Sequence, residues 1–230
     1  MDPMTKILIT GANRGLGYEA ARRLIDAGND VWIGARDAAR GRAAADELGA
    51  RFVELDVLLD GSVAAAAETV GELDVLINNA GISGGRVPVP DVAPDDIARV
   101  FETNVYGLVR VTRAFLPALR RSGHPVIVNV SSGMGSFTVT TDPERVESTI
   151  VSLPYPASKS AVTMLTTQYA KAFPEIRVNA VDPGYTATDF NGHSGPQTVT
   201  EGTDAIVAMA TIGPDGPTGT FTDRHGAVPW

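Results

Sequence analysis

Cysteine is absent from this chain of 230 residues. Its absence excludes disulfide bonds, thiol nucleophiles and cysteine-based zinc sites. The three histidines, His124, His193 and His225, do not have the spacing of a metal site, so we expect no metal ion. No window holds the roughly 18 uncharged apolar residues of a membrane span, and the first residues do not resemble a signal peptide. These absences favour a cytoplasmic location and no membrane partner.

Basic residues are also scarce. The chain has 19 Lys and Arg against 27 Asp and Glu, which gives a formal net charge of -8. A surface for nucleic acid or anionic lipid would need clustered basic side chains, so we expect neither partner. The hydrophobic fraction of 43% is ordinary for a folded protein, which argues against global disorder.

Strand-like and helix-like segments alternate along the whole chain. Apolar runs typical of buried parallel strands occupy residues 6–10, 31–35, 52–55, 75–78, 126–130, 177–181 and 219–222. Apolar residues recur with helical spacing over residues 16–27, 38–48, 62–70, 94–120, 158–173 and 200–211. This alternation predicts one α/β domain over residues 1–230, a Rossmann-type doubly wound parallel sheet of about seven strands with helices on both faces.

A glycine-rich turn, TGANRGLG at residues 10–17, joins the first predicted strand to the first predicted helix. Glycines let a backbone turn sharply and approach a pyrophosphate, which binds among the free N–H groups of a helix N-terminus. We therefore expect a dinucleotide held by Gly11, Asn13, Gly15, Leu16 and Gly17. The alternative is a glycine-rich β–α turn that binds no ligand.

The second predicted strand indicates which dinucleotide binds. An acidic residue at its end would hold the ribose 2′-hydroxyl of NAD, but Ala35 stands there and Arg36 follows. Arg14 lies within the glycine turn, and two guanidinium groups can hold a 2′-phosphate. These residues favour NADP. Alternatively, both arginines are ordinary surface residues, with Arg36 paired to Asp37.

Tyr155 and Lys159, in the string YPASK, are four residues apart and share one face of a predicted helix. Pro156 is tolerated only in a first helical turn, so the helix begins near Tyr155. A lysine ammonium one turn away should lower the pKa of the phenol and suit it to acid–base chemistry. A Tyr–Lys pair alone is common on exposed helices, so its neighbours matter.

Two polar residues accompany this pair. Ser132 follows the fifth predicted strand, where a hydroxyl can hydrogen-bond a substrate carbonyl oxygen. Asn104 lies inside a long predicted helix, where asparagine competes for backbone hydrogen bonds. It therefore suggests a local irregularity or a bound water. The alternatives are a serine-rich loop and a tolerated polar residue.

Taken in order, these motifs resemble the short-chain dehydrogenase/reductase family over nearly the whole chain. The resemblance implies that Tyr155 is the acid–base and that Lys159 tunes it and holds the nicotinamide ribose. It also implies that Ser132 orients the carbonyl and Asn104 anchors a water. Further cofactor contacts implied by the matching motifs are Asp56, Val57, Asn79, Ala80, Gly81, Pro183, Gly184, Thr186 and Thr188.

Within that family the chain is most similar to carbonyl reductases, which implies NADPH as cofactor. Arg14, the string ARDxxRG at residues 35–41 and the C-terminal GPTGTF and PW strings carry this similarity. The 22 residues between Ser132 and Tyr155 are more than most of the family has, but fewer than in the animal carbonyl reductases. Their number leaves a monomer, a homodimer and a homotetramer open.

Residues 133–154 and 184–198 lack a regular pattern and follow strand ends, where open α/β sheets bind ligands. We expect them to form the substrate mouth, with Ser132, Met134, Phe137, Tyr185 and Phe190 as contacts. Few fixed charges lie there, which favours an apolar or aromatic aldehyde or ketone. The leading hypothesis is an NADPH-dependent carbonyl reductase. The alternatives are a non-catalytic NADP(H)-binding sensor and an NAD-dependent alcohol dehydrogenase.

Overall fold

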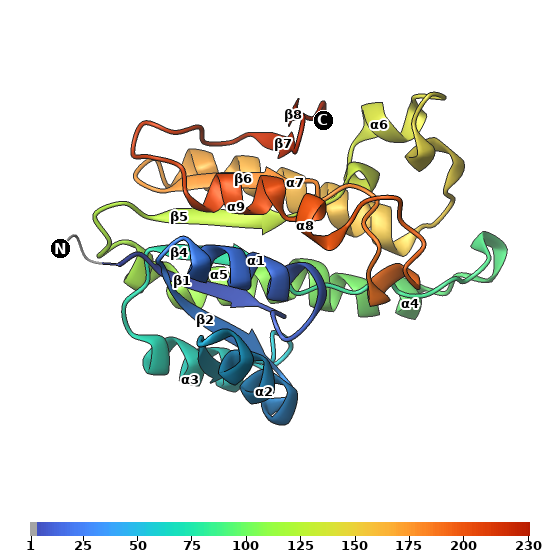
Figure 1. Ribbon diagram of the computed structural model, residues 1–230. Helices are drawn as coiled ribbons and strands as arrows, with labels where there is room; N and C mark the ends of the chain where they lie inside the picture. The colour runs from blue at the N-terminus through green and yellow to red at the C-terminus, as the bar shows by residue number, and fades with distance from the viewer. Residues whose placement is uncertain (1–3) are drawn as a thin grey trace.

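One twisted sheet runs through the molecule, with its strands in the spatial order β3-β2-β1-β4-β5-β6-β7-β8 (Figure 1). The strands are β1 (Lys6–Thr10), β2 (Asp30–Ala35), β3 (Arg51–Glu54), β4 (Val75–Asn78), β5 (Val126–Val130), β6 (Arg177–Val181), β7 (Phe221–Asp223) and β8 (Gly226–Ala227). The first seven pair in parallel, and β8 pairs antiparallel to β7. This computed structural model describes residues 4–230, so residues 1–3 of the predicted domain lie outside the described residues.

Helices cover both faces of the sheet, as the doubly wound prediction requires. They are α1 (Gly15–Asp26), α2 (Ala38–Leu48), α3 (Asp60–Val70), α4 (Pro94–Phe101), α5 (Gly107–Leu119), α6 (Phe137–Thr141), α7 (Pro154–Ala172), α8 (Val199–Gly202) and α9 (Asp204–Ala210). Apolar side chains of α1, α2 and α9 form one buried cluster with the strands. Those of α3 and α5, with partly buried residues of α7, form the cluster on the opposite face.

Each predicted strand is present: β1, β4, β5 and β6 have the predicted bounds, and the ends of β2, β3 and β7 differ by one or two residues. The eighth strand was not predicted, because two residues at a hairpin have no period to detect. No helix within residues 4–230 is both long enough and apolar enough to cross a membrane.

Two predicted helices are interrupted. The helix predicted over residues 94–120 is divided by one π-helical turn, Glu102–Tyr106, which contains Asn104. This turn is the irregularity that the asparagine indicated, and such turns often mark functional sites. The helix predicted over residues 200–211 is divided into α8 and α9 at Thr203. Residues 133–154 are more ordered than predicted, because they include α6 and two short 3-10 turns.

The buried face of α5 generates the first prediction. Phe115 is 0% exposed, whereas Phe137 on α6 is 77% exposed. Phe115→Ala should lower the free energy of unfolding by about 3–5 kcal/mol, since a buried aromatic leaves a cavity that the core cannot fill. Denaturant unfolding measures this change. Phe137→Ala is the matched control and should change it by less than about 0.5 kcal/mol. Equal losses in the two variants would contradict the assignment of Phe115 to the core.

Candidate active site

A large cleft opens where the central strands end. Its volume is about 1490 Å³, and its walls come from the segments that follow β1, β2, β3, β4, β5 and β6. Sites for one small ligand typically occupy about 300–1,000 Å³, so this cleft has room for a dinucleotide beside a substrate. Every residue predicted to contact the cofactor lines it.

The turn requires glycine at two positions because the backbone packs closely against its neighbours there. Gly11 has a φ of +64°, and a Cβ there would lie 3.0 Å from the Cα of Ala80. A Cβ on Gly17 would lie 2.6 Å from Nδ2 of Asn79. That Nδ2 group donates a hydrogen bond of 2.8 Å to the carbonyl oxygen of Thr10. A residue with a Cβ at either position would therefore push the turn away from the loop that follows β4.

The N-terminus of α1 fits a pyrophosphate. Arg14 occupies the N-cap position but makes no side-chain capping hydrogen bond, and the first turn contains no acidic residue. The first N–H groups of the helix therefore remain available, and the helix dipole favours an anion there. Gly15, with a φ of +59°, leaves the approach open, since a Cβ would meet only a methyl group of Thr188, 4.0 Å away.

The region predicted to hold the 2′-phosphate is basic and open. Ala35, Arg36 and Arg14 all line the cleft, and Arg36 is exposed. Asp37 caps α2 and pairs with Arg40 at 3.3 Å, so the alternative Arg36–Asp37 pair does not form. Arg14 pairs with Asp189 across the cleft at 3.2 Å. Because both partners are largely exposed, this pair is worth at most about 1 kcal/mol and leaves Arg14 able to change partner.

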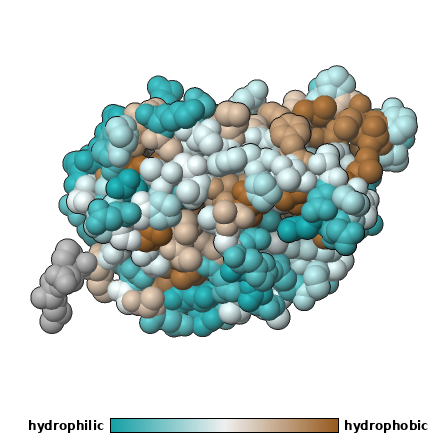
Figure 2. All heavy atoms as spheres, turned by 90° about the horizontal axis from the view of Figure 1, so that it is seen from above, coloured by the Kyte–Doolittle hydropathy of each residue, from teal (hydrophilic) through white to brown (hydrophobic). Residues whose placement is uncertain are grey.

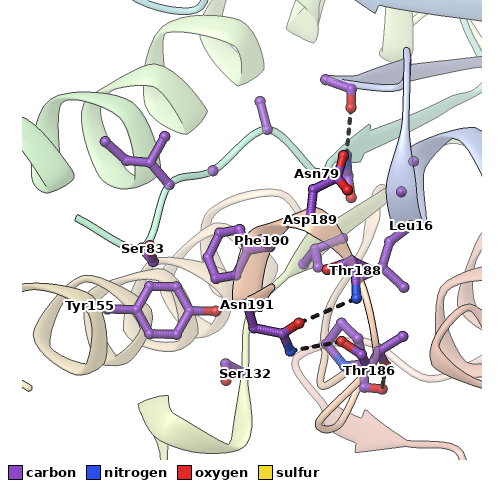
Figure 3. A pocket seen from close by; sticks show the side chains of 18 of the residues that line it. Leu16, Asn79, Ser83, Ser132, Tyr155, Thr186, Thr188, Asp189, Phe190 and Asn191 are labelled. Atoms are coloured by element: carbon purple, nitrogen blue, oxygen red, sulfur yellow. Dashed lines mark hydrogen bonds between the residues drawn. The ribbon is translucent and has the colours of Figure 1, made fainter. Parts of the chain in front are cut away.

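Segments after β3 and β6 supply the remaining predicted cofactor contacts. Asp56 and Val57, predicted to lie near the adenine, line the cleft. At the other end, the hydroxyl of Thr186 donates to the carbonyl oxygen of Pro183 at 3.0 Å. Asn191 donates to the carbonyl oxygen of Thr186 at 2.8 Å (Figure 3). These bonds fix the turn that the sequence assigned to the nicotinamide.

Tyr155 and Ser132 face each other in the cleft (Figure 3). Burial raises the pKa of Tyr155 to about 12, while a hydrogen bond with the Ser132 hydroxyl lowers it and Asp182 raises it further. The sequence led us to expect a lowered pKa, but in the protein alone the loss of solvent around the phenol raises it. At neutral pH Tyr155 is therefore a protonated phenol. Ser131, by contrast, donates its hydroxyl to the backbone of Lys159.

Lys159 lies below Tyr155 and is only 5% exposed. Its Nζ donates to the carbonyl oxygen of Val130 at 2.8 Å and lies 5.6 Å from the centre of the Tyr155 ring. Burial lowers its pKa to about 8, and the charge of Asp182 opposes that effect. The lysine is therefore a buried cation at neutral pH, held close to the ring of Tyr155.

Asn104 does not line the cleft but is buried behind it, at 2% exposure. Its Oδ1 accepts from the backbone N–H of Ile82 at 2.8 Å, and its Nδ2 donates to the hydroxyl of Ser158 at 3.0 Å. The π-helical turn thus joins the loop after β4 to α7. The water-anchoring role remains a prediction, and both hydrogen atoms of the side-chain amide are already donated to protein groups.

Of the five predicted substrate residues, all but Phe137 line the cleft. Met134, Tyr185 and Phe190 line the cleft, and the ring of Phe190 lies 5.5 Å from that of Tyr155. Phe137 does not line it, because α6 turns this side chain to the outside. Apolar atoms gather at the end of the molecule that carries α6 and the following segment (Figure 2, right). The exposed apolar residues of that segment are Phe137, Val146, Ile150, Val151 and Leu153.

Sequence reasoning missed one wall of the cleft. The loop after β4 contributes Ile82, Ser83, Arg86, Val87 and Pro88. These residues carry no periodicity, and only their place after a strand end could have indicated them. No cluster of three or more histidine, aspartate or glutamate side chains able to hold a metal ion occurs within residues 4–230.

Comparisons with known proteins agree with this geometry. The family model described as short chain dehydrogenase matches residues 5–198. A (+)-neomenthol dehydrogenase from Arabidopsis thaliana is 32% identical over 94% of this chain and 95% of its own. A (-)-isopiperitenone reductase from Mentha piperita is 30% identical over 96% of both. The solved structure of the carbonyl reductase Sniffer of D. melanogaster is similar with a TM-score of 0.86 at 25% identity, over 99% of this chain and 100% of that one.

The buried ammonium predicts a conflict between stability and activity. Lys159→Met should raise the free energy of unfolding at neutral pH by roughly 2–3 kcal/mol, since it removes a charge whose pKa burial lowers to about 8. Between about pH 8 and 10.5 the folded state loses this proton while the unfolded state keeps it. The gain should therefore shrink as pH rises through that range, and urea unfolding at neutral pH and at about pH 9.5 measures it.

Lys171→Met is the control for this comparison, because Lys171 is exposed in the last turn of α7. It should change the stability by less than about 0.5 kcal/mol at both pH values. A Lys159→Met protein that is less stable than wild type at neutral pH would contradict the desolvation argument.

Proposed function

This chain belongs to the short-chain dehydrogenase family, and on that premise we propose that it is an NADPH-dependent reductase of apolar or aromatic aldehydes and ketones. Its relatives include proteins named (-)-isopiperitenone reductase and (+)-neomenthol dehydrogenase, and the structure of the carbonyl reductase Sniffer is similar. The observation that carries the proposal is the meeting of Ser132, Tyr155 and Lys159 in a cleft that the glycine turn also lines.

Ser132, Tyr155 and Lys159 each have a separate role in the proposed reduction. When bound, NADPH supplies a hydride to the carbonyl carbon. Ser132 donates a hydrogen bond to the carbonyl oxygen and so orients it. Tyr155 gives its proton to that oxygen as negative charge develops there, and a phenol that is protonated at neutral pH suits this donor role. Lys159, as a nearby cation, stabilises the phenolate that remains.

Charge supports NADPH over NADH. Arg14 and Arg36 line the cleft, and Ala35 replaces the carboxylate that would hold a ribose 2′-hydroxyl. A 2′-phosphate can accept charge-assisted hydrogen bonds from both guanidinium groups. The Arg14–Asp189 pair is exposed and weak, so it does not prevent Arg14 from binding the phosphate.

An apolar substrate is supported by the walls beside Tyr155. Met134, Ile150, Val151, Tyr185 and Phe190 line this part of the cleft. Burial of such side chains against a substrate favours binding by about 25 cal/mol per Å² of apolar area. Charged residues also line the cleft, among them Glu147, Asp182, Asp189 and the exposed Arg86.

Turnover tests the proposed reaction. Reduction of a panel of apolar aldehydes, ketones and quinones is followed by the loss of NADPH absorbance. Tyr155→Phe should lower kcat by about 10²–10⁴-fold, because the ring remains but its proton is lost. NADPH binding, measured by fluorescence, should change little. Tight binding without turnover across the panel would instead favour the non-catalytic sensor.

Cofactor choice is tested separately at Arg36. Arg36→Ala should weaken NADPH binding roughly 10–100-fold, the value of one lost charge-assisted contact, and leave NADH binding unchanged. Arg40→Ala is the control, since Arg40 is an exposed arginine in the first turn of α2 and pairs with Asp37. An equal loss for NADPH and NADH in Arg36→Ala would count against a 2′-phosphate contact and favour the NAD-dependent alternative.

A further inference from the structure

The ring of Phe190 lies beside the phenol of Tyr155 in the cleft (Figure 3). The two ring centroids are 5.5 Å apart, and the ring planes are inclined by 57°. Phe190 is nevertheless 45% exposed, so much of its apolar surface remains in water. A ligand that covers this surface next to the proposed proton donor gains the free energy of removing it from water.

Hydrogen bonds within the loop after β6 fix the position of Phe190. The side chain of Asn191 accepts from the backbone N–H of Thr188 at 3.3 Å and donates to the carbonyl oxygen of Thr186 at 2.8 Å. The backbone N–H groups of Asn191 and His193 both donate to the carbonyl oxygen of Thr188, at 3.2 and 2.9 Å. The ring is therefore held in place before a ligand arrives, which reduces the entropy that binding costs.

The polar side chains on either side of Phe190 already have partners. Asp189, the residue before it, pairs with Arg14 at 3.2 Å and with His193 at 2.8 Å. When Arg14 turns to a cofactor phosphate, His193 remains as a partner of Asp189. Asn191, the residue after it, is bonded within the loop. This turn therefore presents an apolar ring, and not a hydrogen-bonding group, to a ligand beside the phenol.

Other apolar residues line the same cleft, but they are mostly aliphatic. Ile150 and Val151, in the segment before α7, are exposed and belong to the apolar end of the molecule (Figure 2). Within residues 4–230, no other phenylalanine and no tryptophan lines the cleft. The aliphatic side chains can bury any apolar substrate. A contact that distinguishes an aromatic substrate from an aliphatic one comes instead from Phe190, the ring in contact with Tyr155.

The distance between the two rings determines which part of a substrate Phe190 can reach. Tyr155 gives its proton to the carbonyl oxygen, so the carbonyl group lies within hydrogen-bond distance of the phenol. Substituents on the carbonyl carbon then lie close to the ring of Phe190. Aromatic rings with centroids roughly 4.5–7 Å apart attract each other beyond the effect of buried area, by an amount that corresponds to about 2–12-fold in binding.

We propose that Phe190 is a specificity-determining residue that favours aryl carbonyl compounds, in which an aromatic ring is joined directly to the carbonyl carbon, over aliphatic ones of equal size. This inference rests on the proposed function and names the substrate class of that site. The hydride and the proton move as described above, and Phe190 takes no part in their transfer.

A pair of matched ketones tests this preference. Acetophenone and cyclohexyl methyl ketone have the same carbon skeleton, and only the first has an aromatic ring. Phe190→Leu keeps an apolar side chain but removes the ring. The ratio of kcat/KM for acetophenone to that for cyclohexyl methyl ketone should fall about 2–12-fold in this variant. The intrinsic reactivities of the two ketones differ, but this difference cancels when the ratio is compared between the two proteins.

Phe137→Leu is the matched control, because Phe137 is an exposed phenylalanine of α6 that does not line the cleft. The ratio should keep its wild-type value in this variant. Equal losses for both ketones in Phe190→Leu would show that Phe190 only holds Tyr155 in place or excludes water, and would overturn the proposal.

Ligand binding separates this inference from the proposed function. Tyr155→Phe keeps the ring that contacts Phe190 and lacks the proton, so its NADPH complex should bind ketones without reducing them. In this background, Phe190→Leu should raise the Kd of acetophenone about 2–12-fold more than that of cyclohexyl methyl ketone, measured by ligand-observed NMR. If this preference is present but the wild type reduces neither ketone, the proposed function fails and the inference stands. If neither ketone binds, or both Kd values rise equally, the inference is wrong whatever the enzyme reduces.

Discussion

The parallel alignment of β1, β4, β5 and β6 is the constraint on which the rest of the site depends. Residue by residue, β4 aligns with β1 and β5, and β5 aligns with β6, so the four strands end at one edge. The chain leaves that edge as the glycine turn, the loop of residues 79–81, the Ser132 loop and the turn of residues 183–188 after β6. Both faces of these strands are buried against helices, so a slip by one residue would exchange the side chains of the two packed faces at once.

Polar groups beneath the cleft turn this alignment into a fixed geometry. The hydroxyl of Thr10 accepts from the backbone N–H groups of Asn79 and Ala80, each at 3.0 Å, which ties the glycine turn to the next loop. Deeper in the sheet, Asn78 donates to Asn129 at 2.9 Å, and Asn129 donates to Thr166 on α7 at 2.9 Å. Buried amides are costly when unpaired, so this chain of bonds specifies how α7, with Tyr155 and Lys159, sits against the strands.

The sequence predicted the parts of the molecule that local patterns encode. Buried strands and long helices have a period, and the glycine turn and the Tyr–Lys pair have a fixed spacing, so all of them were located. Phe137 was wrongly directed into the cleft, because the path of the chain after Ser132 depends on α6 packing against the C-terminal residues. Burial also depends on the whole fold. Sequence alone could therefore not show that Asp182 is enclosed, or that desolvation dominates the pKa of Tyr155.

The free-energy cost of moving a charged side chain in this site depends on how deeply it lies in the cleft. At the mouth, Arg14, Arg36 and Asp189 are solvated, so each can exchange partners for a fraction of a kcal/mol. At the floor, Lys159 and Asp182 are almost fully buried, and neither can move without breaking its hydrogen bond to the backbone. A ligand phosphate entering at the mouth therefore meets groups that adapt to it. A carbonyl reaching the floor meets dipoles and charges that folding has already oriented, so the cost of arranging them is met by the stability of the fold and not by the reaction.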